Sequence, residues 1–201
     1  MSKANKTPDR IQAVWNIHGG EVGIDALLAG RTKIVAVSQL GELKKGAVIP
    51  ARTKKFVPKT AFKTRKEGRW SSPNMASLIL PVAKPIASVP EIATHYRKLE
   101  TQTREWDIMK EYPESIYRDI RVLLAHMDSL TALQPSGEAE GDLLVENYAA
   151  NLFFFVPDVN KPRGGFVFIA IWDSDGSKWY FSASPLDGFV WPAGSRVFSN
   201  C

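Results

Sequence analysis

The chain has 201 residues, of which 44% are hydrophobic and 23% charged, and this balance is typical of one globular domain, alone or with an appendage. Its one cysteine, Cys201, excludes an intramolecular disulfide and a cysteine-based metal cluster. No run approaches 18 apolar residues and the first ten residues lack the apolar core of a secretory signal, so we expect no membrane span. We therefore expect a cytoplasmic protein, with surface display by another route left open.

Residues 1–40 are predicted to form an N-terminal helical segment. Thr7 is placed as the N-cap of a first helix, which ends at Gly19. A second short helix is predicted over residues 21–28, and a strand over residues 33–38. Two short helices across a glycine turn also suggest a helix-turn-helix, but the second helix lacks the basic or amide-rich face that reads DNA.

Residues 41–90 are predicted to form a basic, proline-rich extended arm. Prolines recur and the apolar residues follow no helical period, although a strand is predicted over residues 76–82. Ten lysines and arginines lie between Lys44 and Arg69, opposed only by Glu67, whereas the whole chain has a net charge of +5.

This basic segment suggests one class of partner, nucleic acid or another polyanion. The interleaved aromatic residues Phe56, Phe62 and Trp70 would stack on bases while lysines and arginines hold phosphates. The alternative is a solvated charged arm. The candidate nucleic-acid residues are Lys54, Lys55, Lys59, Lys63, Arg65 and Lys66.

Residues 91–201 are predicted to contain a helix pair followed by an antiparallel sheet. A first helix is expected over residues 91–110, and a second begins at residue 113 with an apolar stripe that reaches Met127. The period then changes to that of strands, which are predicted over residues 152–156, 166–172, 179–184 and 197–198. The predicted fold class is therefore α+β, with helices followed by a C-terminal antiparallel β-sheet.

The chain shows no pattern of a catalytic or metal site. His18, His95 and His126 have no metal-ligand neighbour at helical spacing, so we interpret them as structural. Asp173 and Asp175 resemble part of a calcium loop, but the distal bidentate glutamate is missing and a hairpin turn fits better. We predict no enzyme activity, no cofactor and no metal.

The tail from Ile169 to Cys201 has an unusual composition. Glutamate, glutamine, methionine, threonine and histidine are absent, and three tryptophans stand among small, polar and aromatic residues. This arrangement indicates a rigid framework that carries exchangeable positions. The predicted scaffold residues are Trp172, Trp179, Trp191 and Phe198, joined by Arg196.

The C-terminal third resembles the variable proteins of diversity-generating retroelements in candidate-phylum bacteria. The run from Asn147 to Asn160 is similar to a "GYANIFYVRDVNG" run in those proteins. The stretches 179–187 and 191–199 are similar to their asparagine-rich form "WNVNANSLD…WNAGNRVFS", although the chain ends in Ser-Asn-Cys where they end in "SRN". The opening residues 12–28 also resemble their "LWNKLGGEEGVDRLL" start.

This resemblance implies a C-type-lectin-like fold whose variable residues, within about 169–201, share one exposed face. In such systems a reverse transcriptase randomises template adenines, so asparagine codons change to tyrosine, serine or proline but never to tryptophan or lysine. Tyr180, Ser182, Ser184, Pro192 and Ser195 stand where the related proteins have asparagine.

The implied function is binding of an unknown protein or other macromolecule at the variable surface, and such surfaces favour tyrosine, serine and glycine. The alternative is that the tryptophans are core residues of a β-hairpin protein without a variable role. The predicted ligand-binding residues are Asp173, Asp175, Tyr180, Ser182, Ser184, Asp187, Gly188, Phe189, Pro192 and Ser195.

Overall fold

The computed structural model describes residues 38–63, 68–137, 141–145, 149–158 and 164–199. The chain divides into two compact units, residues 1–37 and 38–201. The two helices predicted within residues 7–28 lie outside the described residues, as does the strand predicted over residues 33–38 except for its last residue.

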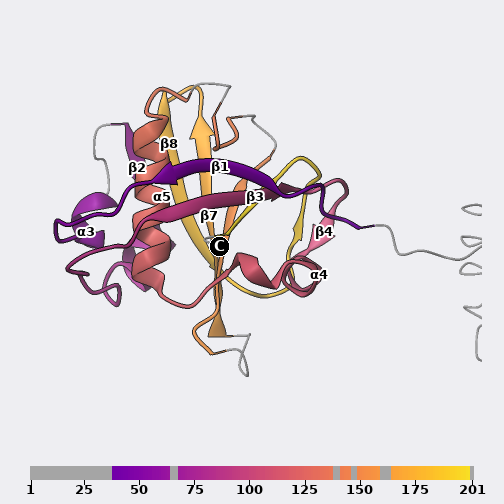
Figure 1. Cartoon of the computed structure of the whole chain (residues 1–201), viewed down its shortest axis with the longest axis horizontal. Coiled ribbons are helices and arrows are strands. Elements are labelled where there is room, and N and C mark those ends of the chain that lie inside the picture. Colours follow the sequence, from indigo (N-terminus) through magenta and orange to yellow (C-terminus); the bar gives the residue numbers. More distant parts are fainter. Residues whose placement is uncertain (1–37, 64–67, 138–140, 146–148, 159–163, 200–201) are drawn as a thin grey trace, which may run out of the picture. The chain divides into compact units, whose positions relative to one another are not determined.

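The second unit is an α+β structure built on one large mixed sheet (Figure 1), which confirms the predicted class. Its strands are β1 Lys44–Ile49, β2 Arg69–Ser71, β3 Ile92–Lys98, β5 Ile116–Tyr117, β6 Asn151–Phe155, β7 Phe166–Asp173, β8 Lys178–Pro185 and β10 Arg196–Ser199. The order across the sheet is β1-β3-β10-β6-β7-β8-β2, with β5 beside β6. A separate pair joins β4 Thr103–Arg104 to β9 Val190–Trp191.

Helices lie between these strands along the chain. They are α3 Pro58–Ala61, α4 Glu105–Glu111 and α5 Ile120–Leu133, with the π-helix η1 Met75–Ile79 and the 3-10 turn η2 Pro113–Ser115. The predicted order of helices first and an antiparallel sheet last is therefore wrong. The sheet begins at Lys44, and it is mixed because β10 and β5 pair parallel with β6 while β2 pairs parallel with β8. Parallel neighbours need long connections, which local patterns do not reveal.

The sheet buries side chains on both faces, and each face has its own hydrophobic cluster. On the first face, α5 packs its apolar residues Leu123, Leu124 and Met127 against strand residues such as Phe153 and Phe198. These helix positions confirm the apolar stripe predicted from the sequence. Figure 1 shows α5 beside β2 and β8, on the side of the sheet that we call the α5 face.

On the second face, α4 contributes Ile108 and Met109 to a cluster with Leu152, Phe154 and Val197. We call this side the α4 face. Successive side chains of a strand point to opposite faces, so the sequence of each central strand divides between the two clusters. Phe153 and Phe154, for example, are both fully buried, one on each face.

The structure corrects the prediction of a helix over residues 91–110. Residues Ile92–Lys98 form β3, and only Glu105–Glu111 are helical. The apolar pair Ile92 and Tyr96 misled the prediction because residues four apart share one face in a strand as well as in a helix. Both side chains pack on the α5 face.

The second predicted helix begins later than expected. Asp119 is its N-cap, since the Asp119 carboxylate accepts a hydrogen bond from Arg121 N–H at 2.8 Å. The residues from Pro113 to Tyr117 form η2 and β5 instead. The helix thus starts where a side chain satisfies the first free amide groups.

The structure also corrects the extended arm. Within residues 41–90, β1 and β2 form the two edges of the large sheet, and the strand predicted over residues 76–82 is replaced by η1. Phe56 and Phe62 are buried in the core of the α5 face. The segment looks irregular in sequence because it contributes single apolar residues to the core between short elements, without a local period.

A buried polar cluster links three elements of the α5 face. His126 of α5 lies 2.9 Å from the Thr94 hydroxyl through Nε2, and its Nδ1 is hydrogen-bonded to the Tyr117 hydroxyl. Burial lowers the pKa of His126 to about 3, because the charged imidazolium would be desolvated there. This environment agrees with the structural interpretation of His126.

Candidate ligand-binding face

Strand β8 separates the predicted variable residues from the core. Trp179, Phe181 and Ala183 are buried on the α5 face. Tyr180, Ser182 and Ser184 alternate with them, point to the opposite side and are half-buried. Of these three, none belongs to either buried hydrophobic cluster. On the α4 face, β8 therefore presents the Tyr180 ring and the hydroxyl groups of Ser182 and Ser184 between its neighbours β7 and β2.

Strand β2 extends this surface at the edge of the sheet. The parallel register pairs Trp70 with Tyr180, and their ring centroids lie 4.6 Å apart with planes tilted by 31°. Two residues further along both segments, the Ser182 hydroxyl donates a hydrogen bond to the Ser72 hydroxyl at 3.1 Å. Trp70 is half-buried, so this aromatic pair is accessible from solvent.

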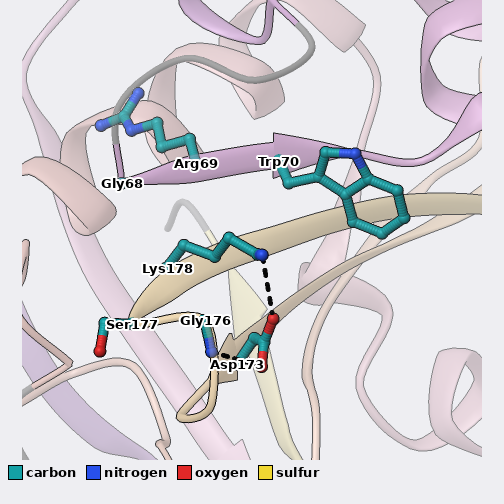
Figure 2. A pocket seen from close by; sticks show the side chains of 7 residues that line it. All are labelled: Gly68, Arg69, Trp70, Asp173, Gly176, Ser177 and Lys178. Carbon is teal, nitrogen blue, oxygen red and sulfur yellow. Dashed lines mark hydrogen bonds and ion pairs between the residues drawn. The ribbon is translucent and has the colours of Figure 1, made fainter.

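The β7–β8 hairpin places two carboxylates at the end of this surface. The Gly176 N–H donates to the Asp173 carboxylate at 3.1 Å, and the Lys178 ammonium lies 3.4 Å from it (Figure 2). The hydrogen bond from Gly176, followed by Lys178, lowers the pKa of Asp173, which keeps this exposed carboxylate ionised. Asp175 is exposed at the tip of the turn.

Two shallow hollows meet at Trp70 and Asp173. One, of about 470 Å³, is lined by both residues together with Arg69 and Lys178. Figure 2 shows Trp70 and Arg69 leaving β2 in different directions, with Arg69 directed away from Lys178. The other hollow, of about 440 Å³, is lined by Trp70, Ile171, Trp172, Asp173, Ser174, Asp175 and Tyr180. We call this second one the hairpin hollow.

The remaining predicted ligand residues lie in another group, on the loop before and after β9. Asp187 and Phe189 are exposed, and Pro192 is half-buried. The Glu105 carboxylate of α4 accepts hydrogen bonds from the amides of Gly188 and Phe189 at 2.9 and 3.2 Å. Burial raises the pKa of Glu105, and these two hydrogen bonds oppose the rise. The buried Glu105 carboxylate thus anchors the loop between β8 and β9 through two backbone amides.

One predicted ligand position, Ser195, is wrong for a reason that only the tertiary structure provides. Ser195 is fully buried, and its hydroxyl accepts a hydrogen bond from the Ala150 amide at 3.3 Å, so it cannot touch a ligand. Gly188 has φ of +89°, a conformation that favours glycine, and a Cβ there would lie 3.0 Å from Trp106 Nε1. The turn therefore requires glycine at this position, which is half-buried, and contact of Gly188 with a ligand stays a prediction.

The predicted scaffold residues take the expected structural role in three of four cases. Trp179, Trp191 and Phe198 are buried, and the Trp179 indole donates to the Gln134 carbonyl at 2.8 Å. Trp172 is half-buried: it packs edge-on against Trp179 and also lines the hairpin hollow.

Sequence reasoning missed Trp70 and Glu105 as parts of this face. The basic segment suggests Trp70 as a base-stacking residue, whereas in the structure its ring lies against that of Tyr180, which is far away in sequence. No local signal reports that contact. Glu105 follows a short strand at the start of α4, and its buried carboxylate could not be distinguished from an ordinary acidic residue in the first turn of a helix.

The prediction that the basic segment binds nucleic acid fits the structure at its lysines but not at its phenylalanines. Lys54, Lys55, Lys59 and Lys63 are exposed, whereas Arg65 and Lys66 lie outside the described residues. Phe56 and Phe62 are at most 4% exposed and cannot stack on bases, so this part of the nucleic-acid prediction is wrong.

In the described ranges there is no group of three or more histidine, cysteine, aspartate or glutamate side chains arranged to hold a metal ion. None of the described helices is both long and apolar enough to cross a membrane. Comparisons of the chain with protein-family models, with curated proteins and with solved structures found no match.

Proposed function

We propose that this chain is a non-enzymatic ligand-binding protein of C-type-lectin-like fold, whose C-terminal surface is diversified by a retroelement. The observation that carries the proposal is the alternation along β8. The positions reachable from asparagine codons, Tyr180, Ser182 and Ser184, are half-buried on the α4 face. The unreachable Trp179 is buried in the core on the opposite face. Along β8, mutation at adenines would thus change the surface and spare the core.

Two further features support this proposal. Pro192, another position reachable from asparagine, is also half-buried on the surface. The face is supported by elements outside the variable tail, since β2 contributes Trp70 and α4 contributes Glu105. A rigid support of this kind lets surface positions change at a cost of a few tenths of a kcal/mol. Because Ser195 is buried, the proposal does not include it among the variable positions.

The proposal is tested in the genome that encodes the chain. We expect a nearby reverse transcriptase gene and a template repeat that matches the codons of residues 169–199. The two copies should differ only at template adenines, with differences at the codons of Tyr180, Ser182 and Ser184 and none at that of Trp179. A repeat that differs at other bases, or the lack of any repeat, contradicts the proposal.

A second candidate function is attachment to nucleic acid through the basic segment, and the exposure of four lysines favours it. These residues are Lys54, Lys55, Lys59 and Lys63. Without stacking by Phe56 and Phe62, such binding would depend on phosphate contacts, and its affinity would fall steeply with salt. Replacing the four lysines by glutamine should remove binding to DNA and RNA at low salt. Equal binding by the wild type and the variant contradicts this candidate.

A further inference from the structure

The hairpin hollow combines aromatic walls with negative charge. Three rings line it, those of Trp70, Trp172 and Tyr180, and two carboxylates, those of Asp173 and Asp175, stand at its rim. The described residues that line it include no lysine and no arginine. This contrasts with the chain as a whole, which has a net charge of +5. A cationic ligand would therefore find complementary charge here.

The two carboxylates differ in how far they are already neutralised. Asp173 has Lys178 at 3.4 Å and the Gly176 amide as partners. Asp175 is exposed, and the structure shows no ion pair for it within the described ranges. Asp175 is thus the carboxylate that is free to pair with a group on a ligand.

We infer that the hairpin hollow binds an arginine side chain of a partner protein. A guanidinium plane stacks on aromatic faces and donates hydrogen bonds in a fixed fork that matches a carboxylate. The Trp70–Tyr180 pair supplies the aromatic wall, and Asp175 supplies the carboxylate. This inference rests on the proposed function in that it names the chemistry of the ligand for the same face. It also gives Trp70, a residue outside the variable tail, a direct part in binding.

The inference is tested by titrating the full chain, labelled with ¹⁵N at its indoles, with N-acetyl-L-argininamide. The matched control probe is N-acetyl-L-citrullinamide, which has the same shape and no charge. We expect saturable shifts of the Trp70 and Trp172 indole signals, with a dissociation constant on the order of 1–10 mM. The citrulline probe should give no saturable shift. The lysine analogue should bind at least several-fold more weakly than the arginine probe.

Two variants assign the effect to the hollow. Asp175→Asn should weaken binding of the arginine probe about fivefold or more, and because Asp175 is exposed this change leaves the fold intact. Asp107→Asn, which removes an exposed carboxylate of α4 that neither lines the hollow nor belongs to the predicted ligand-binding residues, should leave the affinity unchanged.

Equal shifts with both probes, no saturable shift up to about 50 mM, or equal losses in the two variants would overturn the inference. These results leave the genomic test untouched. A template repeat without arginine binding would show that the ligand class is wrong and the diversification right.

Discussion

The two sides of β8 differ in burial, and this difference separates residues of the core from the residues that our proposal assigns to ligand binding. On the α5 face, Trp179 and Phe181 are buried among the residues of α5, α3 and η1. On the α4 face of the same strand, Tyr180 contacts Trp70 of β2 through a ring pair, and Ser182 contacts Ser72, the residue after β2, through a hydroxyl pair. Neighbouring residues thus differ in what a substitution would cost. We expect the buried side to require shape and apolar character, and the half-buried side to accept a wider range of side chains.

The first prediction compares the loss of stability caused by substitutions on the two sides of β8. Trp179→Ala should lower the free energy of unfolding by about 3–5 kcal/mol, because it leaves a cavity and removes the hydrogen bond to Gln134. Tyr180→Ala should cost about 0.5–1.5 kcal/mol, mainly through the lost stacking on Trp70. Urea unfolding of both variants measures the difference. Similar losses would show that the two sides are not distinct.

The second prediction concerns pH and the α5 face. The folded pKa of His126, about 3, is lower than its unfolded value near 6.5, so its neutral form contributes stability above pH 6.5 that is lost as the pH falls toward 3. Between pH 6.5 and 4.5 we expect a loss of about 2–3 kcal/mol. Denaturant unfolding at each pH measures it. In His126→Gln the loss over this window should largely disappear, and an unchanged slope would contradict the assignment.

The third prediction uses one substitution at two serines that the resemblance treats alike. Ser195→Asn should destabilise the fold by about 1–3 kcal/mol, because the larger side chain has to enter a fully buried site beside Ala150. Ser184→Asn should change stability by no more than about 0.5 kcal/mol, since Ser184 is half-buried. Thermal unfolding of the two variants compares them. A tolerant Ser195 would return this position to the variable set.

The fourth prediction concerns the stability of a library in which all the proposed variable positions of β8 change together, and there we expect the smallest loss of stability. A library at Tyr180, Ser182 and Ser184 that encodes the products of asparagine codons should keep most members within about 0.5–1 kcal/mol of the parent. Proteolysis of the displayed library followed by sequencing measures the retained fraction. A matched library at Trp179, Phe181 and Ala183 should be mostly unfolded, because all three side chains are buried. Equal survival of both libraries would contradict the separation.

The C-terminal strands could be predicted from sequence because their signals are local. The predicted strands at residues 152–156, 166–172 and 179–184 match β6, β7 and β8 within a residue or two. Apolar alternation, with turn residues at the hairpin from Asp173 to Lys178, is enough to define them. The helix prediction over residues 91–110 failed because its local signal was ambiguous. The spacing of Ile92 and Tyr96 fits the period of a strand as well as that of a helix.

The candidate site was predicted in part. The outward direction of Tyr180, Ser182 and Ser184 follows from alternation once Trp179 is assigned to the core. The prediction for Ser195 failed because this residue lies between β9, which pairs with β4, and β10, which pairs with β3 and β6. Segments from elsewhere in the chain therefore enclose it. Its hydroxyl resembles those of β8 in sequence, and only its surroundings differ.

The amino-acid sequence is enough to divide strand β8 into core-facing and outward-facing residues, because the two-residue period of a strand is visible in neighbouring positions. What the outward-facing residues contact depends on the tertiary structure. Trp70 reaches Tyr180 because β2 joins β8 in parallel register across a long stretch of chain. Glu105 reaches the loop after β8 because α4 packs beneath it. Such contacts depend on the closure of the whole sheet, and no local pattern encodes them.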